Sequence, residues 1–518
     1  MSRDRALLVG ALVTAFLLLS WSDAHYWDEF YYLYSVLVHS PAELLRFEGE
    51  TQHFPPGFFS EKLGHVLILH QLTGRLGGGE RTLYTIQFLY ALLVVGFVAA
   101  AYGLMRELLQ DADASIAALV LLFSPLALYL AYKAMSEVPS LLFITLGSWA
   151  FVRAFRPADR SIQTGLLVLA VAGLTLGMLC RVTVIASFMG LGLALLLAGD
   201  QRFDRRRLFG RLLVVGLAVV TLHVGAVHLA GGSVHHTGAH IHSVISGHPP
   251  LQRVYALALF LQALALLLPF AWGAPSAWWP RFAIAWLAAA AVPFVVGHEP
   301  RYYAPALVPL ALVAGAGLRR AADLLFPATW RYAWVALLVP IVVVDRFVLV
   351  PLMPYEVSQA TLLGVFKTFH DREPGATYLV PWSSDFSLLR FAFPDANVVL
   401  CLTGSAASRH GMTGGMGALS PPDQWWAGIG HYVGADSALA EMPEPRYYIG
   451  WEENPAAVRL QRLMGSLGLA HLMSKGPKLH NHLEESWIWS DDSWLLTRRG
   501  QVAQYQVYEV TPRSRRAG

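Results

Sequence analysis

LYTIQFLYALLVVGFVAAAYGLM, residues 83–105, contains no charged side chain over 23 consecutive positions. A helix of this length rises roughly 35 Å, which is enough to cross a bilayer hydrocarbon core of roughly 30 Å. Similar apolar runs recur up to about residue 350, where a more polar sequence begins. The chain is 55% hydrophobic and only 14% charged, against about 25% charged in an average soluble domain. We therefore expect an α-helical polytopic membrane protein.

Eleven segments qualify as candidate membrane spans. The first follows Arg3 and Arg5 as a signal peptide would, but no small-residue cleavage site follows it, so we expect a retained helix. Several spans are short, and the neighbours near residues 180 and 300 nearly touch, so merging or re-entry is the alternative to eleven crossings. The spans are 6–22, 83–105, 114–131, 138–153, 162–180, 182–199, 211–230, 252–272, 282–297, 302–318 and 331–350.

The basic residues indicate the orientation of these spans. They gather in alternate connections, as the positive-inside rule expects of cytoplasmic loops. This bias places the N-terminus in the cytoplasm and residues 351–518 outside. The residues concerned are Arg106, Arg153, Arg156, Arg160, Arg202, Arg205, Arg206, Arg207, Arg211, Arg281, Arg319, Arg320 and Arg331.

Two domains are predicted. Residues 1–350 form a transmembrane catalytic domain whose outer loop 23–82 carries juxtamembrane helices. Residues 351–518 form a small extracytoplasmic α/β domain. Its expected strands, recognised by short β-branched and aromatic runs between turn residues, are 376–381, 397–402, 446–450 and 504–510.

An acidic pair follows the first span. Asp28 and Glu29 lie in HYWDEFYY, residues 25–32, and the stretch to Phe47 has the spacing of an amphipathic interfacial helix. Adjacent positions do not share a helix face, so one carboxylate can face a cavity while the other caps or pairs. The alternative is that both are solvated beside an interfacial aromatic belt.

Further candidates lie in the same outer regions. His53 precedes a double proline, residues 55–56, whose rigid turn either presents the imidazole or is only a loop corner. Lys133 and Glu137 stand four residues apart where the third span meets the fourth. They form a simple salt bridge, or they supply a cation and a carboxylate at the level of the acidic pair.

Another outer turn, HEPRYY, begins at His298. Arg301 carries a planar guanidinium suited to phosphate, and His298 and Tyr302 are candidate substrate contacts. The alternative is an arginine that extends to the interface and pairs with Glu299. Arg181 is a further external cation at a helix boundary.

Five histidines lie between the seventh and eighth spans. His236 and His240 have the four-residue spacing that places two imidazoles on one helix face toward a divalent metal. Glycines nearby favour a plain flexible loop instead.

The external helix ends thus combine carboxylates, histidines and cations. Carboxylates there can deprotonate an acceptor hydroxyl or hold a metal, and cations can stabilise a phosphate leaving group. A transporter more often places its polar groups near the bilayer midplane.

These segments resemble the GT-C superfamily of polyprenyl-phosphate-sugar-dependent glycosyltransferases. The chain looks similar to the aminoarabinose transferase and protein O-mannosyltransferase group, glycosyltransferase families 39 and 83. The resemblance covers residues 5–350 in layout. Its short matches are Asp28-Glu29, Pro55-Pro56, Ser124-Pro125 leading to Glu137, and Arg301-Tyr302 with Pro305 and Pro309.

The resemblance implies an inverting transfer with the lipid phosphate as leaving group. It implies that Asp28 is the general base or orients the acceptor, with Glu29 as its neighbour. Glu137 matches a second acidic position, and Arg301 matches a position suited to the donor phosphate.

The chain departs from the aminoarabinose transferases at one point. Those enzymes typically carry Glu-Lys before the double proline, where this chain has His53 and Phe54. Lys133, Arg181 or Arg301 is therefore expected to contact the phosphate, and the sugar is left open. The turn at His298 also resembles a segment of eukaryotic lipid-linked mannosyltransferases.

The predicted function is transfer of a sugar from a polyprenyl-phosphate donor to a glycolipid, polysaccharide or protein acceptor. The arginine, alanine and leucine usage is typical of GC-rich bacteria, so the expected location is the outer face of a bacterial inner membrane. A net charge of +3 gives no indication of nucleic acid as a partner. The alternatives are a lipid or sugar transporter or flippase, and a non-catalytic scaffold whose outer domain binds a partner.

Overall fold

A computed structural model gives the fold, and by its internal contacts the chain divides into two compact units. The first unit is Met1–Trp21, Ser60–His65 and Gln87–Met353, and the second is Ser22–Phe59, Val66–Ile86 and Pro354–Gly518. The predicted domain boundary after residue 350 stays a prediction. The structure describes residues 3–50, 59–109, 111–156, 159–198, 203–235, 250–272, 278–291, 299–326, 333–349, 353, 357–381, 383–400, 442–451, 455–467 and 494–513.

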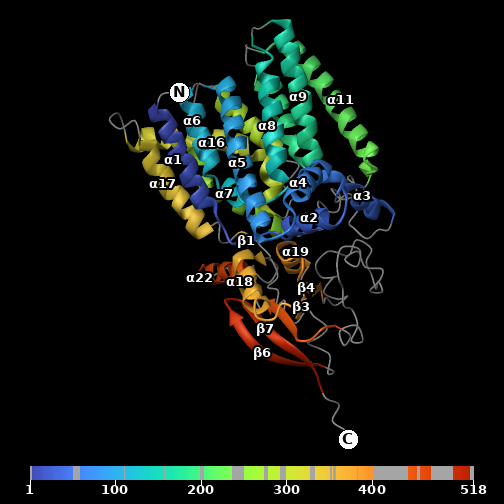
Figure 1. Cartoon of the computed structure of the whole chain (residues 1–518). Coiled ribbons are helices and arrows are strands. Elements are labelled where there is room, and N and C mark those ends of the chain that lie inside the picture. The colour runs from blue at the N-terminus through green and yellow to red at the C-terminus, as the bar shows by residue number, and fades with distance from the viewer. Residues whose placement is uncertain are drawn as a thin grey trace. The chain divides into compact units, whose positions relative to one another are not determined.

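The first unit is built from helices (Figure 1). Over the described residues, each predicted span coincides with one helix or with a broken series of helices. The elements are α1 (Arg3–Ser20), η1 (Ser60–Lys62), the start of α4 (Leu63–Leu76), most of α5 (Glu80–Leu108), α6 (Asp111–Leu122), α7 (Pro125–Leu130), α8 (Glu137–Arg153), α9 (Arg160–Cys180), η2 (Val182–Ile185), α10 (Ala186–Ala198), α11 (Arg205–Leu229), α13 (Pro250–Leu261), η3 (Gln262–Leu267), α14 (Leu268–Trp272), α15 (Trp278–Ala291), η5 (Pro300–Ala306), α16 (Leu307–Leu325), α17 (Ala333–Val344) and the π-helix η6 (Asp345–Leu349).

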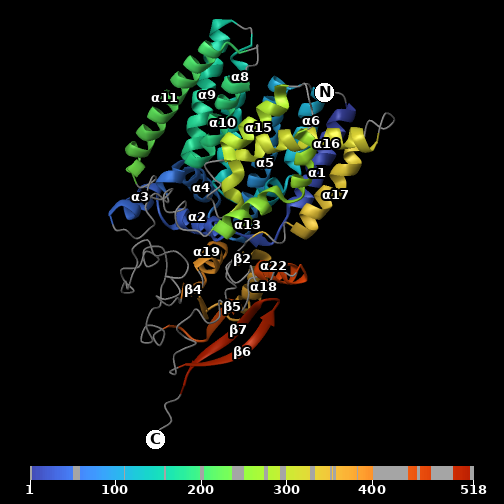
Figure 2. The same cartoon turned by 180° about the vertical axis from the view of Figure 1, so that it is seen from behind.

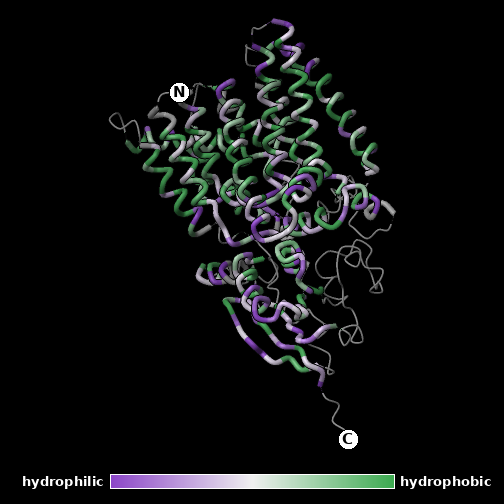
Figure 3. Tube along the Cα trace, in the orientation of Figure 1, coloured by the Kyte–Doolittle hydropathy of each residue, from purple (hydrophilic) through white to green (hydrophobic). Residues whose placement is uncertain are grey.

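Among the described residues, four helical stretches are long and apolar enough to cross a membrane: Glu80–Leu108, Arg160–Cys180, Arg205–Leu229 and Arg253–Ala271. Shorter apolar helices accompany them. Figure 3 shows hydrophobic residues along the bodies of these helices. The helical membrane fold is thereby confirmed, whereas the count of eleven spans stays a prediction.

A proline at a helix start explains one break in the predicted spans. Ser124 precedes α7, and its side chain accepts a hydrogen bond from the Ala127 amide. Pro125 occupies the first turn, where its missing N–H and fixed φ suit a helix start. The third predicted span is therefore two helices, α6 and α7, and the turn after α7 leads to Glu137.

Close packing of α8 on α9 positions the charged groups at one end of the pair. A Cβ on Gly147 would lie 2.9 Å from the Leu174 amide nitrogen, and one on Gly173 would lie 3.0 Å from the Gly147 Cα. Small residues let membrane helices approach this closely. The Ser140 hydroxyl also donates to the Gly177 carbonyl at 2.7 Å. On the other face of the unit, α10 packs on α15 and α15 on α16 (Figure 2).

The second unit contains the segment after the first membrane helix. Its elements there are β1 (Ala24–His25), α2 (Trp27–Val38) and α3 (Pro41–Glu50), together with the greater part of α4 and the start of α5. β1 pairs antiparallel with β2 (Val357–Ser358). Asp23 accepts hydrogen bonds from the Ser358 hydroxyl and the Ala360 amide. Chain segments more than 300 residues apart are therefore joined beside the acidic pair.

The C-terminal part of this unit is a five-stranded mixed sheet in the order β4-β3-β5-β7-β6. β3 pairs parallel with β4 and β5, and β7 pairs antiparallel with β5 and β6. The four predicted strands are confirmed, and β6 was not predicted. The elements are α18 (Gln359–His370), β3 (Thr377–Val380), α19 (Ser383–Ala392), β4 (Asn397–Leu400), β5 (Arg446–Trp451), α22 (Pro455–Ser466), β6 (Trp494–Val502) and β7 (Tyr505–Pro512).

Candidate active site

A buried ion-pair cluster lies at the end of α8 and α9 in the first unit. Glu137 is the first residue of α8 and is fully buried. Its Oε1 lies 3.3 Å from Nη1 of Arg181 and 3.9 Å from Nε of Arg301. Three of the predicted site residues are thus brought together by α8, α9 and η5.

Both arginines are buried rather than extended toward solvent. Burial disfavours the charge on Arg181, yet the carboxylates of Glu137 and Glu61 outweigh it and hold the guanidinium pKa above its ordinary value. Arg301 also pairs with Glu299. The ring of Tyr302 lies under both guanidinium groups, with centroids 5.3 Å and 5.6 Å away, so it is placed for cation–π contact.

Two neighbouring charges were not predicted. Glu61 and Lys62 end the short helix η1 and are both buried, with Lys62 Nζ 3.7 Å from Glu61 Oε2. The Glu-Lys dipeptide, expected before the double proline, lies instead at residues 61–62. It follows the proline pair by a few residues, and the dipeptide itself is the signal that identifies this lysine in the sequence.

His65 completes this side of the cluster. Its Nδ1 lies 3.1 Å from the Tyr90 hydroxyl oxygen, and a hydrogen bond joins it to the Ala134 backbone. Burial, followed by the positive charges of Lys62 and Arg181, lowers the imidazole pKa to about 3. His65 is therefore neutral at physiological pH and adds no further positive charge.

Replacing His65 with glutamine is expected to flatten the acid side of the stability–pH curve. Between the folded pKa of about 3 and an unfolded pKa of about 6.5, only the unfolded chain binds the extra proton. Wild-type stability therefore falls as the pH drops through this window. From about pH 6.5 to about pH 5 the loss is about 2 kcal/mol at about 1.4 kcal/mol per unit, and the variant avoids it.

Thermal unfolding of purified protein at both pH values measures this difference. His228→Gln is the matched control because His228 is exposed near the end of α11. Equal pH slopes for wild type and the His65 variant would refute the assignment.

Lys133 lies in the turn that precedes α8. It is fully buried, and its Nζ lies 4.2 Å from the centroid of the Tyr129 ring. The neighbouring Tyr132 has a left-handed φ of 58°, an uncommon conformation for an aromatic residue that tends to occur at functional turns. Glu137, which follows Lys133 by four residues, pairs with two arginines from other elements, Arg181 and Arg301.

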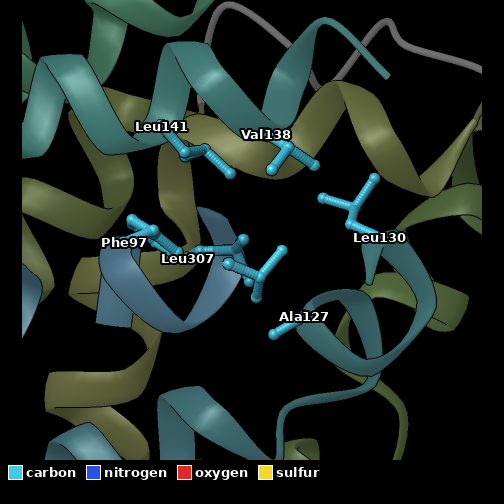
Figure 4. Close-up of a pocket in the computed structure, with 7 residues that line it drawn as sticks. Phe97, Ala127, Leu130, Val138, Leu141 and Leu307 are labelled. Atoms are coloured by element: carbon cyan, nitrogen blue, oxygen red, sulfur yellow. The ribbon is translucent and has the colours of Figure 1, made fainter. Parts of the chain in front are cut away.

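An apolar layer borders this cluster. Val138 and Leu130 adjoin the charged turn and face Phe97 and Leu307 across a small pocket (Figure 4). Water is disfavoured beside such side chains, and a lower local dielectric strengthens the neighbouring ion pairs.

The acidic pair belongs to the second unit, at the start of α2. Asp28 and Glu29 are both buried, so the alternative of two solvated carboxylates is wrong. Glu29 Oε2 lies 2.5 Å from His25 Nδ1. Glu29 is thus held by a histidine four residues earlier in the chain. This agrees with the expectation that one carboxylate of the pair is engaged in a local contact.

Aromatic side chains surround this start of α2. Tyr31 stacks against Phe59 with ring centroids 6.2 Å apart, and Tyr32 meets the same ring edge-on. His25 lies 5.5 Å from the ring of Phe30. These ring contacts give the carboxylates in the first turn of α2 a defined position.

Four predicted site residues lie outside the described residues: His53, His298, His236 and His240. The predicted roles of the first two in substrate binding and of the last two in metal binding stay predictions. Within the ranges that the structure describes, no three His, Cys, Asp or Glu side chains gather as metal ligands.

Comparisons with known proteins agree with this fold. Residues 68–225 match the family described as dolichyl-phosphate-mannose-protein mannosyltransferase. No curated protein matches. The crystal structure of ArnT from Cupriavidus metallidurans bound to undecaprenyl phosphate is 15% identical, with 98% of both chains covered and a TM-score of 0.54. Its apo structure is 14% identical over the same shares, with a TM-score of 0.56.

A third structure is the archaeal oligosaccharyltransferase AglB from Archaeoglobus fulgidus. It is 13% identical, covers 77% of this chain and 65% of its own, and has a TM-score of 0.49. The two ArnT structures establish a shared fold over nearly the whole chain. With the family match, they confirm the resemblance expected from the sequence.

Proposed function

We propose that this chain is a GT-C glycosyltransferase that uses a polyprenyl-phosphate sugar donor. We further propose that the buried cluster around Glu137 binds the phosphate of that donor. In this proposal Asp28 is the general base that activates the acceptor. The transfer inverts the configuration at the anomeric carbon.

The observation that carries the proposal is the charge of the cluster. Within the described residues, the cluster and the adjoining turn before α8 contain four buried cations, two buried carboxylates and the half-buried Glu299. A buried excess of positive charge is costly unless an anion compensates it. A lipid phosphate supplies that anion and accepts charge-assisted hydrogen bonds from lysine and arginine. The cations are Lys62, Lys133, Arg181 and Arg301, and the buried carboxylates are Glu61 and Glu137.

Glu137 has a positioning role in this scheme. Its ion pairs with Arg181 and Arg301 hold two guanidinium groups at one helix end. Its predicted role as a second catalytic acid stays a prediction. The aromatic ring of Tyr302 supports the same two groups.

Asp28 is the proposed base because it holds the position that the family resemblance assigns to the base, and its carboxylate is buried in the first turn of α2. The Glu29 carboxylate is held by His25, which leaves Glu29 as a positioning residue for the first turn of α2. The Asp28 carboxylate accepts the proton of an acceptor hydroxyl as that oxygen bonds to the anomeric carbon. The bond from that carbon to the phosphate oxygen breaks, and the cations stabilise the departing polyprenyl phosphate.

The direction of the chain in the membrane follows from the positive-inside bias. We place the N-terminus in the cytoplasm of a bacterial inner membrane and the C-terminal sheet outside. The transfer then occurs at the outer face, and the acceptor is a glycolipid, a polysaccharide or a protein. ArnT, whose fold this chain shares, was crystallised with undecaprenyl phosphate, which supports a lipid of that class as donor carrier.

The test is an assay of purified protein with a panel of polyprenyl-phosphate sugars and extracted envelope acceptors. Transfer of one sugar with release of polyprenyl phosphate is the expected result. Movement of the lipid across reconstituted vesicles without transfer from any donor would favour the alternative, a lipid transporter or flippase.

Replacing Lys62 with methionine is expected to raise the donor KM by roughly 10- to 100-fold. This range corresponds to about 1.5–3 kcal/mol for a hydrogen bond to a charged group. Methionine keeps the length of the side chain and removes its charge. Initial rates over a range of donor concentrations measure the effect.

Lys367→Met is the control because Lys367 is an exposed lysine of α18 that pairs with Glu80 at 3.9 Å. An unchanged donor KM in the Lys62 variant would remove this residue from the phosphate site.

A further inference from the structure

A second site lies along α9 and α11 of the first unit, beside exposed apolar side chains of both helices. The two helices enclose an apolar groove of about 620 Å³. The residues at one end of the groove belong to the second turns of both helices. The groove is lined by Thr164, Leu167, Val168, Val171, Ala172, Gly210, Arg211, Val214, Val215 and Leu222.

The groove ends at a fixed arginine. Arg211 Nη2 donates to Oε1 of Gln163 at 3.0 Å, and its Nη1 donates to the Ala154 carbonyl at 2.9 Å. Its guanidinium lies 4.7 Å from the centroid of the Phe155 ring. This arginine ties α11 to α9 and closes the apolar channel with a positive charge.

More positive charge lies at the start of the same helix. Arg205, Arg206 and Arg207 form the exposed first turn of α11, between four and six residues before the arginine that closes the groove. Arg160 is the exposed first residue of α9. Against these arginines, the acidic residues at the same two helix ends are Asp159 and Asp204, the residues that precede α9 and α11. Both helix N-termini add positive dipole ends.

We infer that this groove binds one anionic glycerophospholipid, with its acyl chains along the apolar channel and its phosphate headgroup on the arginines of α11. Basic pockets at the cytoplasmic ends of membrane helices bind anionic headgroups in this way. The chemistry favours an anionic lipid over a zwitterionic one, because the second has a cationic group that the arginines repel.

The inferred site is distinct from the donor phosphate site. α9 has 21 residues and is therefore about 31 Å long. Arg160 begins this helix and Arg181 follows its end, so the two clusters of positive charge lie at opposite ends. With the proposed orientation, the groove opens to the cytoplasmic leaflet, and its occupant is separate from the lipid donor.

The test is native mass spectrometry of the full chain, purified in detergent and mixed with dioleoyl phosphatidylglycerol or dioleoyl phosphatidylcholine. We expect one tightly retained phosphatidylglycerol molecule. Replacing Arg205, Arg206 and Arg207 with glutamine is expected to reduce the preference for phosphatidylglycerol by roughly 100-fold, or about fivefold for each arginine.

A second variant tests the groove itself. A Cβ added to Gly210 meets nothing within 4 Å, so Gly210→Phe fills the groove without disturbing the backbone, and we expect loss of the retained lipid. Gly216→Phe is the matched control, because Gly216 lies on the same helix with equally open space and is not part of the groove lining.

Equal retention of the two lipids by wild type would overturn the inference and leave only ordinary bilayer lipid in the groove. Unchanged retention in Gly210→Phe would overturn it as well. Glycosyl transfer, assayed on the same samples, reports on the proposed function separately, because none of these substitutions touches the donor cluster.

Discussion

Asp28→Asn is expected to reduce glycosyl transfer by about 10²- to 10⁴-fold, the usual contribution of a positioned general base. Asparagine has nearly the same shape as aspartate, so the buried first turn of α2 keeps its packing. The amide accepts no proton, so the acceptor hydroxyl is no longer activated. The expected loss is in kcat, with little change in the donor KM, because Asp28 acts on the acceptor in this mechanism.

The matched control for this variant is Glu43→Gln. Glu43 is an exposed carboxylate in the first turn of α3 that accepts hydrogen bonds from the Ser40 amide and hydroxyl. Glutamine retains an acceptor oxygen there. Wild-type kcat in the Asp28 variant would end its assignment as the base, and an equal loss in both variants would indicate a general structural effect.

Glu137→Gln is expected to destabilise the protein by about 3–5 kcal/mol, the typical cost of removing one partner from a buried ion pair. Arg181 and Arg301 then remain buried beside a neutral amide. Thermal or denaturant-induced unfolding of the purified protein measures the loss. Transfer activity is expected to fall with it, because these two guanidinium groups lose their common anchor.

Glu107→Gln is the control for this effect. Glu107 pairs with Arg153 at 3.1 Å and with Arg156 at 2.5 Å, and those arginines are 42% and 52% exposed. Glu107 itself is 9% exposed, but solvent screens pairs with such exposed arginines, and we expect a loss of about 1 kcal/mol or less. The double variant Glu137→Gln/Arg181→Gln should be less destabilised than the sum of its single variants. Strict additivity would disprove the coupling between these two side chains.

The membrane helices and most of the sheet were predictable because their signals are local. A run of apolar residues such as 83–105 is long enough to span a bilayer whatever the rest of the chain does. The strands near residues 377, 397, 446 and 505 follow from β-branched and aromatic runs between turn residues. β6 was not predicted, since Trp494–Val502 includes the polar run Thr497–Gln501, which obscures the alternation typical of a strand.

The interruptions of the helices were only partly predictable. Ser124 and Pro125 are a recognisable helix start, yet they lie inside an apolar run that hydropathy alone reads as one span. The short pairing of β1 with β2 joins positions more than 300 residues apart. Two residues on each side carry no pattern that a sequence analysis detects.

The residues of the candidate site were predictable from local signals, but their contacts with one another were not. Asp28, Glu137 and Arg301 were predictable as ionisable residues beside apolar spans, where charge is costly and seldom kept without a role. By itself the sequence determined a helical membrane protein with carboxylates and cations at helix ends, because hydropathy and charge are properties of local segments.

Only the tertiary structure decided which of these charges meet. Glu137 and Arg181 come together because α8 and α9 pack closely through Gly147 and Gly173, and η5, which contacts α8, adds Arg301. A second close contact, in which a Cβ on Gly64 would lie 3.0 Å from the Leu179 carbonyl carbon, brings Lys62 and His65 near Arg181, more than 100 residues later in the chain. Burial and ion pairing depend on contacts between distant segments, and those contacts exist only once the helices have packed.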